Sequence, residues 1–212
     1  MSILENLFKT RRFLRYYSQD KYPEESLINE LVEKTFHLVP SKQNLIPYFV
    51  NIFGPNRKEE KEQIMELSTR PLHKEKLGRN PNVQLKAPYL LVICNRLVEP
   101  NKWVSHLIKT GYMFRVCDKN QYMKIVTAKD VSLEIGMFIA ILTGLALEKN
   151  ISCSYTLCHF NEPEKQTLVK DRVLCIMSLG YPYDEVINEE VHKSRLQKGE
   201  TRPKLKDLML WK

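Results

Sequence analysis

The longest apolar run in the chain, at Val131–Leu147, predicts a helix that is buried around most of its circumference. Gly136, Ala140 and Gly144 recur every fourth residue, and such a ridge of small residues lets a second helix approach closely. The run is too short to span a membrane, and Glu134 within it and the charged residues that close it interrupt its apolar character. We therefore expect a core helix, which is compatible with a place at a subunit interface.

Four shorter segments rich in aromatic and β-branched residues predict the strands of a sheet. They are Tyr48–Phe53, Tyr89–Cys94, Ile151–Phe160 and Arg172–Leu179. Ile151–Phe160 directly follows the apolar helix, so we expect it to be a central strand. Tyr89–Cys94 is continuously apolar, which also indicates a central strand.

Helical patterns surround these strands. They cover Ser2–Thr10, Tyr22–Leu38, Asn56–Ser68 and Glu162–Val169. Residues 95–127 mix aromatic and basic residues without clear periodicity, and we interpret them as a cap over the core. The pattern indicates an α+β fold, in which helices flank a mixed or antiparallel sheet of about four or five strands. At 212 residues, we expect a single domain covering 1–212.

The cysteines indicate a reducing environment. There are five of them, an odd number, and no C-x-x-C pair occurs, so buried free thiols are favoured over a disulfide framework or a zinc site. The N-terminal residues show no signal-peptide pattern. We therefore expect a cytoplasmic protein.

The net charge of +8 is carried by the two ends of the chain. Residues 1–22 carry a net charge of +3 and residues 191–212 a net charge of +5, so the middle of the chain is neutral. The basic ends could be solvated tails, or they could converge on one anion such as a phosphate. A nucleic-acid binder is disfavoured, because the middle supplies no net charge to extend a basic face.

The usual sequence signatures of catalysis are absent. With seven glycines, the chain has no G-x-G-x-x-G and no phosphate-binding P-loop motif. No nucleophile motif, H-E-x-x-H pair or cluster of metal-ligating residues occurs, and the five histidines are far apart. If the protein is an enzyme, a cofactor is expected to carry the chemistry.

Two segments are candidates for ligand binding. Arg11, Arg12 and Arg15 stand close together, and the arginine fork suits phosphate, although a surface basic cluster is the alternative. The polar, proline-bracketed loop Pro40–Tyr48 contains Ser41, Gln43 and Asn44, which could donate to a heteroaromatic ligand. Simple turn formation by these residues is the alternative.

Several motifs together resemble the FMN-dependent nitroreductase family. They are R-R-F-L-R-Y-Y at 11–17, P-S-K-Q-N-L-I-P-Y at 40–48, S-C-S-Y-T-L-C-H-F at 152–160, V-L-C-I-M-S-L-G-Y-P at 173–182 and R-P-K-L-K-D-L-M-L-W at 202–211. Each motif alone is weakly specific, and the resemblance rests on their order and spacing.

The resemblance implies an α+β homodimer that binds FMN at the subunit interface, with the long buried helix in the dimer core. It also implies that residues 191–212 wrap the partner subunit. The implied activity is a ping-pong reaction, in which NAD(P)H reduces the flavin by hydride transfer to N5. A nitroaromatic, a quinone or a similar electron-poor acceptor then reoxidises it, without a side-chain base.

The resemblance also implies which residues bind FMN. Arg11, Arg12, Arg15 and Arg202 would hold the phosphate, with Phe13 among them. The other implied contacts are Pro40, Ser41 and Asn44 from the other subunit, Asn80 at the pyrimidine edge, and Leu157, Cys158 and His159 along the ring.

The chain departs from the family pattern at three sites. Phe13 stands where many members have serine, Ile46 where many have glutamine, and Cys158-His159 where Gly-Gly or Glu-Gly is frequent. The bulkier His159 would reshape one side of the ring. A flavin-retaining protein that serves as a carrier or binds a partner without turnover is therefore the alternative to an enzyme.

Overall fold

The computed structural model describes residues 14–41, 44–68, 82–96, 102–110, 131–157 and 172–183. In chain order its elements are α2 (Glu25–Leu38), β1 (Tyr48–Phe53), α3 (Lys58–Leu67), the 3₁₀ helix η2 (Val83–Lys86), β2 (Tyr89–Asn95), α5 (Lys102–Lys109), α7 (Val131–Glu148), β3 (Ser152–Thr156) and β4 (Val173–Gly180). The predicted helices Ser2–Thr10 and Glu162–Val169, and the segment 191–212, lie outside the described residues.

The described strands form one antiparallel sheet in the order β1, β2, β4, β3. β2 is an inner strand and is buried at every position up to Cys94, which confirms the predicted central strand. β3 lies at an edge of this four-stranded sheet, so the prediction that it is central is wrong for the described strands. Tyr155 in β3 is 42% exposed, as suits an edge strand with water on one side.

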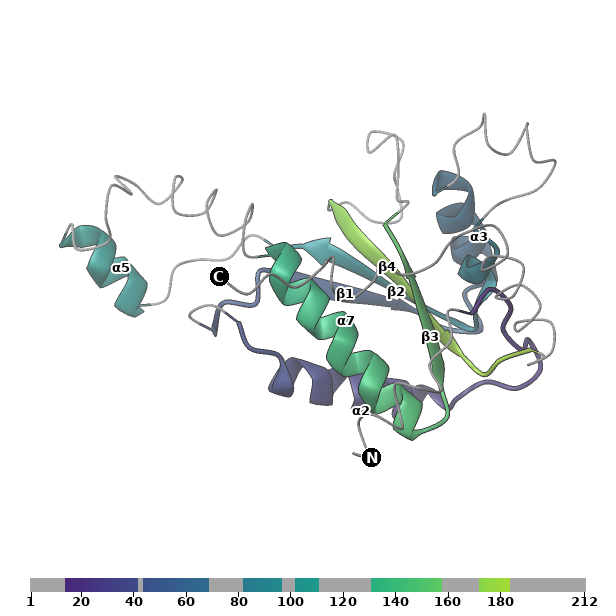
Figure 1. Cartoon of the computed structure of the whole chain (residues 1–212). Coiled ribbons are helices and arrows are strands. Elements are labelled where there is room, and N and C mark those ends of the chain that lie inside the picture. Colours follow the sequence, from purple (N-terminus) through teal and green to yellow (C-terminus); the bar gives the residue numbers. More distant parts are fainter. Residues whose placement is uncertain are drawn as a thin grey trace, which may run out of the picture.

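The side chains of β2 alternate between two packed layers, as strand geometry requires. Leu91 and Ile93 belong to a core cluster with α2 and α7, whereas Leu90 and Val92 belong to a cluster with α3 and η2. Figure 1 shows α2 and α7 together over one face of the sheet. The fold therefore has a helical layer on each face of the sheet.

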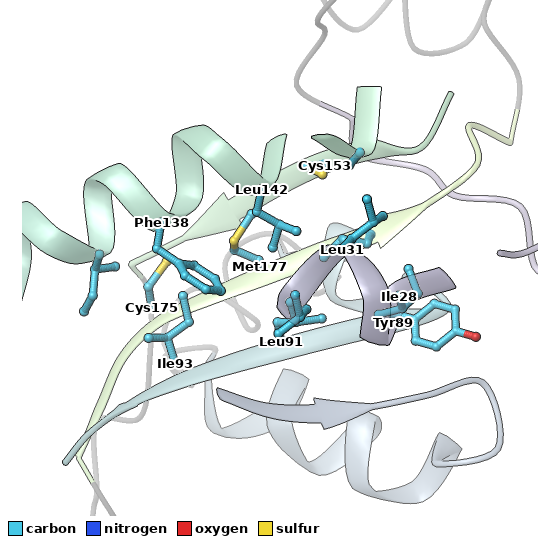
Figure 2. Close-up of a cluster of buried hydrophobic side chains, with 14 of the residues drawn as sticks. Ile28, Leu31, Tyr89, Leu91, Ile93, Phe138, Leu142, Cys153, Cys175 and Met177 are labelled. Carbon is cyan, nitrogen blue, oxygen red and sulfur yellow. The ribbon is translucent and has the colours of Figure 1, made fainter. Parts of the chain in front are cut away.

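The layer of α2 and α7 packs through large apolar side chains. Phe138 and Leu142 of α7 point toward the sheet, where Cys175 and Met177 of β4 lie (Figure 2). The ring of Phe138 also meets Phe36 of α2, with a centroid distance of 5.0 Å. Burying a phenylalanine, leucine or methionine side chain in this layer contributes about 1.5–3 kcal/mol relative to leaving it exposed.

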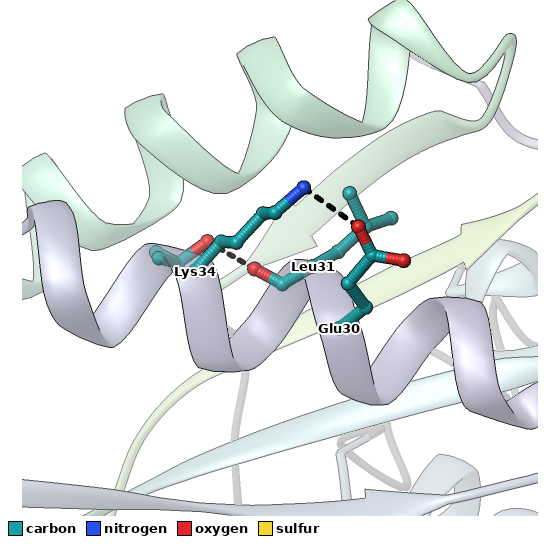
Figure 3. Close-up of polar contacts among 4 residues, drawn as sticks. Glu30, Leu31 and Lys34 are labelled. Atoms are coloured by element: carbon teal, nitrogen blue, oxygen red, sulfur yellow. Dashed lines mark hydrogen bonds and ion pairs between the residues drawn. The ribbon is translucent and has the colours of Figure 1, made fainter.

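The outer side of α2 is charged. Lys34 Nζ lies 2.6 Å from Glu30 Oε1, one turn away on the exposed side of the helix (Figure 3). The interaction lowers the pKa of Glu30 and raises the pKa of Lys34. On the inner side, Thr35 donates its hydroxyl to the carbonyl oxygen of Leu31 at 2.7 Å. α2 begins at Glu25 rather than at the predicted Tyr22.

The outer side of α7 is apolar. Val131, Phe138 and Leu142 are buried, but Leu133 is 67% exposed and Gly136 is exposed too. The prediction that this helix is buried around most of its circumference is therefore wrong for the single chain. By length and composition α7 could cross a membrane, so the prediction that this run is too short to span one is wrong. A core helix of a soluble protein meets the same criteria, and the inner side of α7 is packed on α2 and the sheet.

Helix α5 was not predicted, because residues 95–127 showed no clear periodicity. Figure 1 shows it apart from the sheet and the other described helices. Residues 97–101 and 111–127 of the expected cap lie outside the described residues. The predicted free thiols are confirmed for the three described cysteines, Cys94, Cys153 and Cys175, all of which are buried and unbridged.

Candidate functional site

The loop that precedes β1 and the residue that follows β3, Leu157, leave the sheet at the same end. Tyr48 at the start of β1 lies opposite Asn95 at the end of β2. The backbone N–H of Asn95 donates to the carbonyl oxygen of Arg172 at 2.9 Å, just before β4. Antiparallel β3 finishes beside the first half of β4, so Leu157 emerges there as well. We call this edge the loop end of the sheet.

Arg96 holds the loop onto the sheet. Its backbone N–H donates to the carbonyl oxygen of Pro47 at 3.0 Å, and its Nη2 donates to the carbonyl oxygen of Leu45 at 3.3 Å. The neighbouring strand residues Ile93 and Cys94 carry a register shift toward β4. A bulge of this kind bends a strand and re-aims its end. The loop is therefore held by the backbone and the guanidinium of Arg96 as well as by its prolines.

The loop is also braced from within. Ser41 Oγ accepts the backbone N–H of Ile46 at 2.8 Å, and the backbone N–H of Asn44 donates to the carbonyl oxygen of Ser41 at 3.0 Å. Asn44 and Ile46 have φ angles of 58° and 45°. Asparagine tolerates this left-handed region, but a β-branched residue there is strained. Strain of this kind is typical of loops that hold a ligand.

The loop residues that are predicted to contact a ligand differ in how exposed they are. Asn44 and Pro40 are exposed, whereas Ser41 is half-buried and its oxygen already accepts a hydrogen bond. A hydroxyl that accepts one hydrogen bond keeps its O–H free to donate elsewhere. Ser41 can therefore brace the loop and still donate to a ligand.

A groove of about 580 Å³ runs between the outer side of α7 and the strands β3 and β4. Gly136 and Ala140 line it on the helix, and Tyr155 and Leu157 line it on the strand. Its walls are mainly apolar, and Arg172 is the charged residue that lines it at the loop end. A mainly apolar groove with a few polar groups is typical of a small-molecule site.

Arg96 and Arg172 were missed as site residues by sequence reasoning. Arg172 opens the predicted strand Arg172–Leu179, and Arg96 falls in the predicted cap region. The signal in the sequence is their position, because each arginine directly flanks a mostly apolar strand. Polar residues at the ends of buried strands tend to line sites, but only the strand order shows that these two ends are neighbours.

Tyr48 places a buried hydroxyl at the loop end that has no hydrogen-bond partner among the described residues. Burial, with the nearby Glu134 carboxylate adding to it, raises the pKa of Tyr48, so its phenol stays protonated. Leaving such a buried hydroxyl without a partner costs about 1–3 kcal/mol.

The segment that contains Arg15 lies in a different part of the molecule from the loop end. This segment hydrogen-bonds to residues after β4, where the backbone N–H of Ser18 donates to the carbonyl oxygen of Tyr181 at 2.9 Å. That is the end of β4 opposite Arg172. The structure therefore brings Pro40, Ser41 and Leu157 to one end of the sheet but does not join Arg15 to them.

The other predicted contacts with FMN stay predictions. They lie outside the described residues and are Arg11, Arg12, Phe13, Asn80, Cys158, His159 and Arg202. Among the described residues, no group of three or more His, Cys, Asp or Glu side chains could hold a metal ion.

The fold is that of the nitroreductase-like proteins. A nitroreductase-like family protein from Bacillus cereus covers 100% of this chain and 96% of its own, at 16% identity and a TM-score of 0.62. A candidate nitroreductase from Exiguobacterium sibiricum, solved in complex with FMN, covers 100% of this chain and 98% of its own, at 14% identity and a TM-score of 0.64.

A candidate NAD(P)H:FMN oxidoreductase from Staphylococcus epidermidis covers 100% of this chain and 96% of its own. Its identity is 12% and its TM-score is 0.64. No protein-family model and no curated protein matches the sequence. At these identities the similarity establishes the fold, and the activity has to be argued from the site.

Proposed function

We propose that this protein is an FMN-dependent oxidoreductase that uses NAD(P)H to reduce small electron-poor acceptors, such as nitroaromatics or quinones. The observation that carries this proposal is that the loop before β1 and Leu157 leave the sheet at the same end. These are two of the segments whose sequences resemble the FMN contacts of nitroreductases. The FMN in the Exiguobacterium neighbour supports the cofactor, and the Staphylococcus neighbour supports the electron donor.

The residues at the loop end fit a flavin. The groove has mainly apolar walls for a planar ring, and about 580 Å³ is within the range of small-molecule pockets. Ser41 and Asn44 offer hydrogen-bond donors. We expect Leu157 to pack against the ring. Arg172 places a positive charge beside the groove, where it favours an anionic substrate or a reduced cofactor.

When bound, FMN supplies two-electron chemistry by hydride transfer at N5, first from NAD(P)H and then to the acceptor. The protein's own task is to bind, orient and exclude water. The braced loop fixes the donors of Ser41 and Asn44, and Leu157 and the α7 side of the groove exclude water. No acid–base residue is required at the reacting atoms, which fits the lack of a catalytic motif in the sequence.

We further propose that the active unit is a homodimer. β1 and β3 lie at opposite edges of the described sheet, and three strand spacings separate them by roughly 14 Å. Within one chain, the loop before β1 and Leu157 are therefore too far apart to contact one face of the same flavin ring. A second copy would bring its loop to Leu157 of the first.

The outer side of α7 is the surface that such a copy would cover. It exposes Leu133, Gly136 and Ala140, and a methyl group added at Gly136 would meet no atom within 4 Å. Exposed contiguous apolar surface of this kind marks an interaction site. The small residues let the helix of a second copy approach closely. Because Gly136 and Ala140 also line the groove, covering this surface would close the groove as well.

The test is the visible absorbance spectrum of the purified protein, followed by release and identification of the chromophore. We expect stoichiometric FMN, and NAD(P)H consumption that depends on an added nitroaromatic or quinone. A colourless protein that also fails to bind added FMN would refute the proposal. Bound FMN without turnover on any acceptor would favour the flavin-retaining alternative.

A matched pair of variants locates the site. Ser41→Ala removes the hydroxyl that braces the loop, so we expect FMN to bind about tenfold more weakly. Ser18→Ala removes a serine hydroxyl that accepts the backbone N–H of Lys21, far from the loop end, and should leave FMN affinity unchanged. Equal effects of the two changes would argue against the assigned site.

A further inference from the structure

A second cavity, of about 450 Å³, lies at the other end of the sheet, which we call the lysine cavity. Pro55 and Asn56 line it just after β1, and Pro88 lines it just before β2. β1 spans six residues, so the cavity is roughly 20 Å from the loop end. It is therefore separate from the proposed flavin site.

Lys61 of α3 lines the lysine cavity and is only 8% exposed. Its Nζ donates to the carbonyl oxygens of Ala87 and Pro88, at 3.1 and 2.8 Å. In the described part of the chain, no carboxylate forms an ion pair with it. An ammonium group has three N–H donors, so these two bonds leave one donor for a ligand in the cavity.

The cavity carries an excess of positive charge. Lys58 and Lys86 line it together with Lys61, and Glu62 is the carboxylate among its lining residues. Burial, and then repulsion from Lys58, lower the pKa of Lys61 to about 8. A buried cation without a counterion is costly, and an anion in the cavity would remove that cost.

The cavity is larger than an inorganic anion requires. A pocket of about 450 Å³ has room for a small organic molecule. Tyr22 presents a ring that is 44% exposed, and Met65 and Leu85 add apolar wall. Gln19 donates its side-chain amide to the carbonyl oxygens of Tyr17 and Lys86, which fixes the mouth of the cavity.

We propose that the lysine cavity binds a small organic oxyanion, whose phosphate or carboxylate head meets Lys61, Lys58 and Lys86 and whose apolar body lies against Tyr22 and Met65. Lys61 provides the desolvated charge, and the two exposed lysines draw the anion in. This site is independent of the proposed oxidoreductase activity, since it uses neither the loop end nor the groove.

Binding is measured by calorimetry on the full-length protein with three probes, which are phenyl phosphate, benzoate and inorganic phosphate. We expect saturable binding of an aromatic probe, and weaker binding of inorganic phosphate because it lacks the apolar body. The stronger of phenyl phosphate and benzoate identifies the preferred head group. No saturable binding of either aromatic probe would overturn the proposal, as would equal binding of phenyl phosphate and inorganic phosphate.

Variants distinguish binding in the lysine cavity from non-specific binding to surface charge. The double variant Lys58→Gln, Lys86→Gln changes two exposed residues, so it should fold normally and weaken binding about tenfold or more. Lys61→Met keeps the buried stem and should abolish saturable binding. The matched control is Lys34→Gln on α2, an exposed lysine on the other helical layer, which should leave binding unchanged. If Lys34→Gln weakens binding as much as the double variant, the binding is non-specific and the proposal fails.

The pH dependence gives a further readout. The titratable groups that line the cavity with Lys61 are Lys58, Glu62, Lys86 and Tyr22. Because the anion favours the ammonium form, binding should weaken as the pH rises through about 8, and ligand should raise the pKa of Lys61. The NMR titration of the Lys61 Cε resonance with and without phenyl phosphate measures this shift. An unchanged titration at saturation would exclude Lys61 as the contact.

Discussion

The two helical layers of this protein are built alike on the inside and differ on the outside. α7 and α3 each present buried apolar side chains to the sheet, such as Phe138 and Ile64. The outer side of α7 is also apolar, with Leu133 and Gly136 exposed. The outer side of α3 carries lysine and glutamate.

This difference indicates what each layer faces. An apolar outer side is costly in water and is expected where a further protein layer covers it. A charged outer side is stable in water and can gather small ions. We therefore assign the α7 layer to a second copy of the chain and the α3 layer to solvent and small anions. The predictions below test this assignment, from the largest expected effect to the smallest.

Ala140→Arg should separate the subunits. Ala140 is exposed in the single chain and lines the groove, so the longer side chain should leave the monomer folded. In a dimer it would place a charge in an apolar interface, which costs several kcal/mol. We expect dimer affinity to fall about 100-fold or more, with loss of FMN, as measured by sedimentation velocity and absorbance.

The control for that variant is Gln63→Arg, which adds the same side chain to the exposed side of α3. It should leave both the dimer and FMN unchanged. A wild-type protein that is monomeric at all concentrations, or an Ala140→Arg variant that dimerises normally, would contradict the assignment of the α7 layer.

Phe138→Ala tests the inner side of the same helix. The ring is fully buried and lies 5.0 Å from the ring of Phe36 and 5.7 Å from that of Tyr48. Its removal leaves a cavity, so the free energy of unfolding should fall by about 3–5 kcal/mol in urea denaturation. Leu133→Ala, made in the monomeric Ala140→Arg background, should lower the free energy of unfolding by less than about 1 kcal/mol. A similar loss in both would mean that the two sides of α7 do not differ.

Local patterns in the sequence were enough to predict most elements. Tyr48–Phe53 is predicted to the residue, because prolines and a glycine bound a run of strand-forming side chains. The predicted start of α2 is three residues too early, and the cause is a contact with a residue far along the chain. The carbonyl oxygen of Pro23 accepts the hydroxyl of Tyr89, which holds the segment before Glu25 outside the helix.

The errors have one physical cause. The sequence of a segment does not show which distant segments pack against it. The apolar run of α7 predicts a helix, but it does not show which side is covered within the chain. Likewise, β3 reads as a strand, while its edge position follows from pairing with β4 alone among the described strands.

The candidate site was predictable only in part. The loop residues Ser41 and Asn44, and Leu157, were identified by resemblance, but their common end of the sheet depends on the strand order. Lys61 lies inside a charged segment that predicts a surface helix. Its one signal is the spacing to Ile64, three residues on, which places both on the buried face of α3.

The pH dependence of stability tests whether Lys61 is buried without a counterion. Its pKa in the folded protein is about 8, below the usual value of 10.5, so the unfolded chain binds more protons between these values. Stability from this group therefore rises as the pH increases from about 8 to 10.5. We expect a gain of about 2–3 kcal/mol relative to Lys61→Met over this window, measured by urea denaturation. Burial raises the pKa of Cys175 to about 12, which acts in the opposite direction in both proteins and cancels in the comparison.

Tyr17→Phe gives the smallest expected effect and tests whether the α3 layer depends on buried hydrogen bonds. The Tyr17 ring is 4% exposed, and its hydroxyl lies 2.8 Å from Ser154 Oγ and donates to the carbonyl oxygen of Ser178 at 3.2 Å. Removing this hydroxyl leaves Ser154 and Ser178 each one buried partner short, so the free energy of unfolding should fall by about 1–2 kcal/mol. Tyr183→Phe is the control, because its ring is 62% exposed and its loss of a hydroxyl should be neutral. If both variants are as stable as wild type, packing alone holds this layer to the sheet.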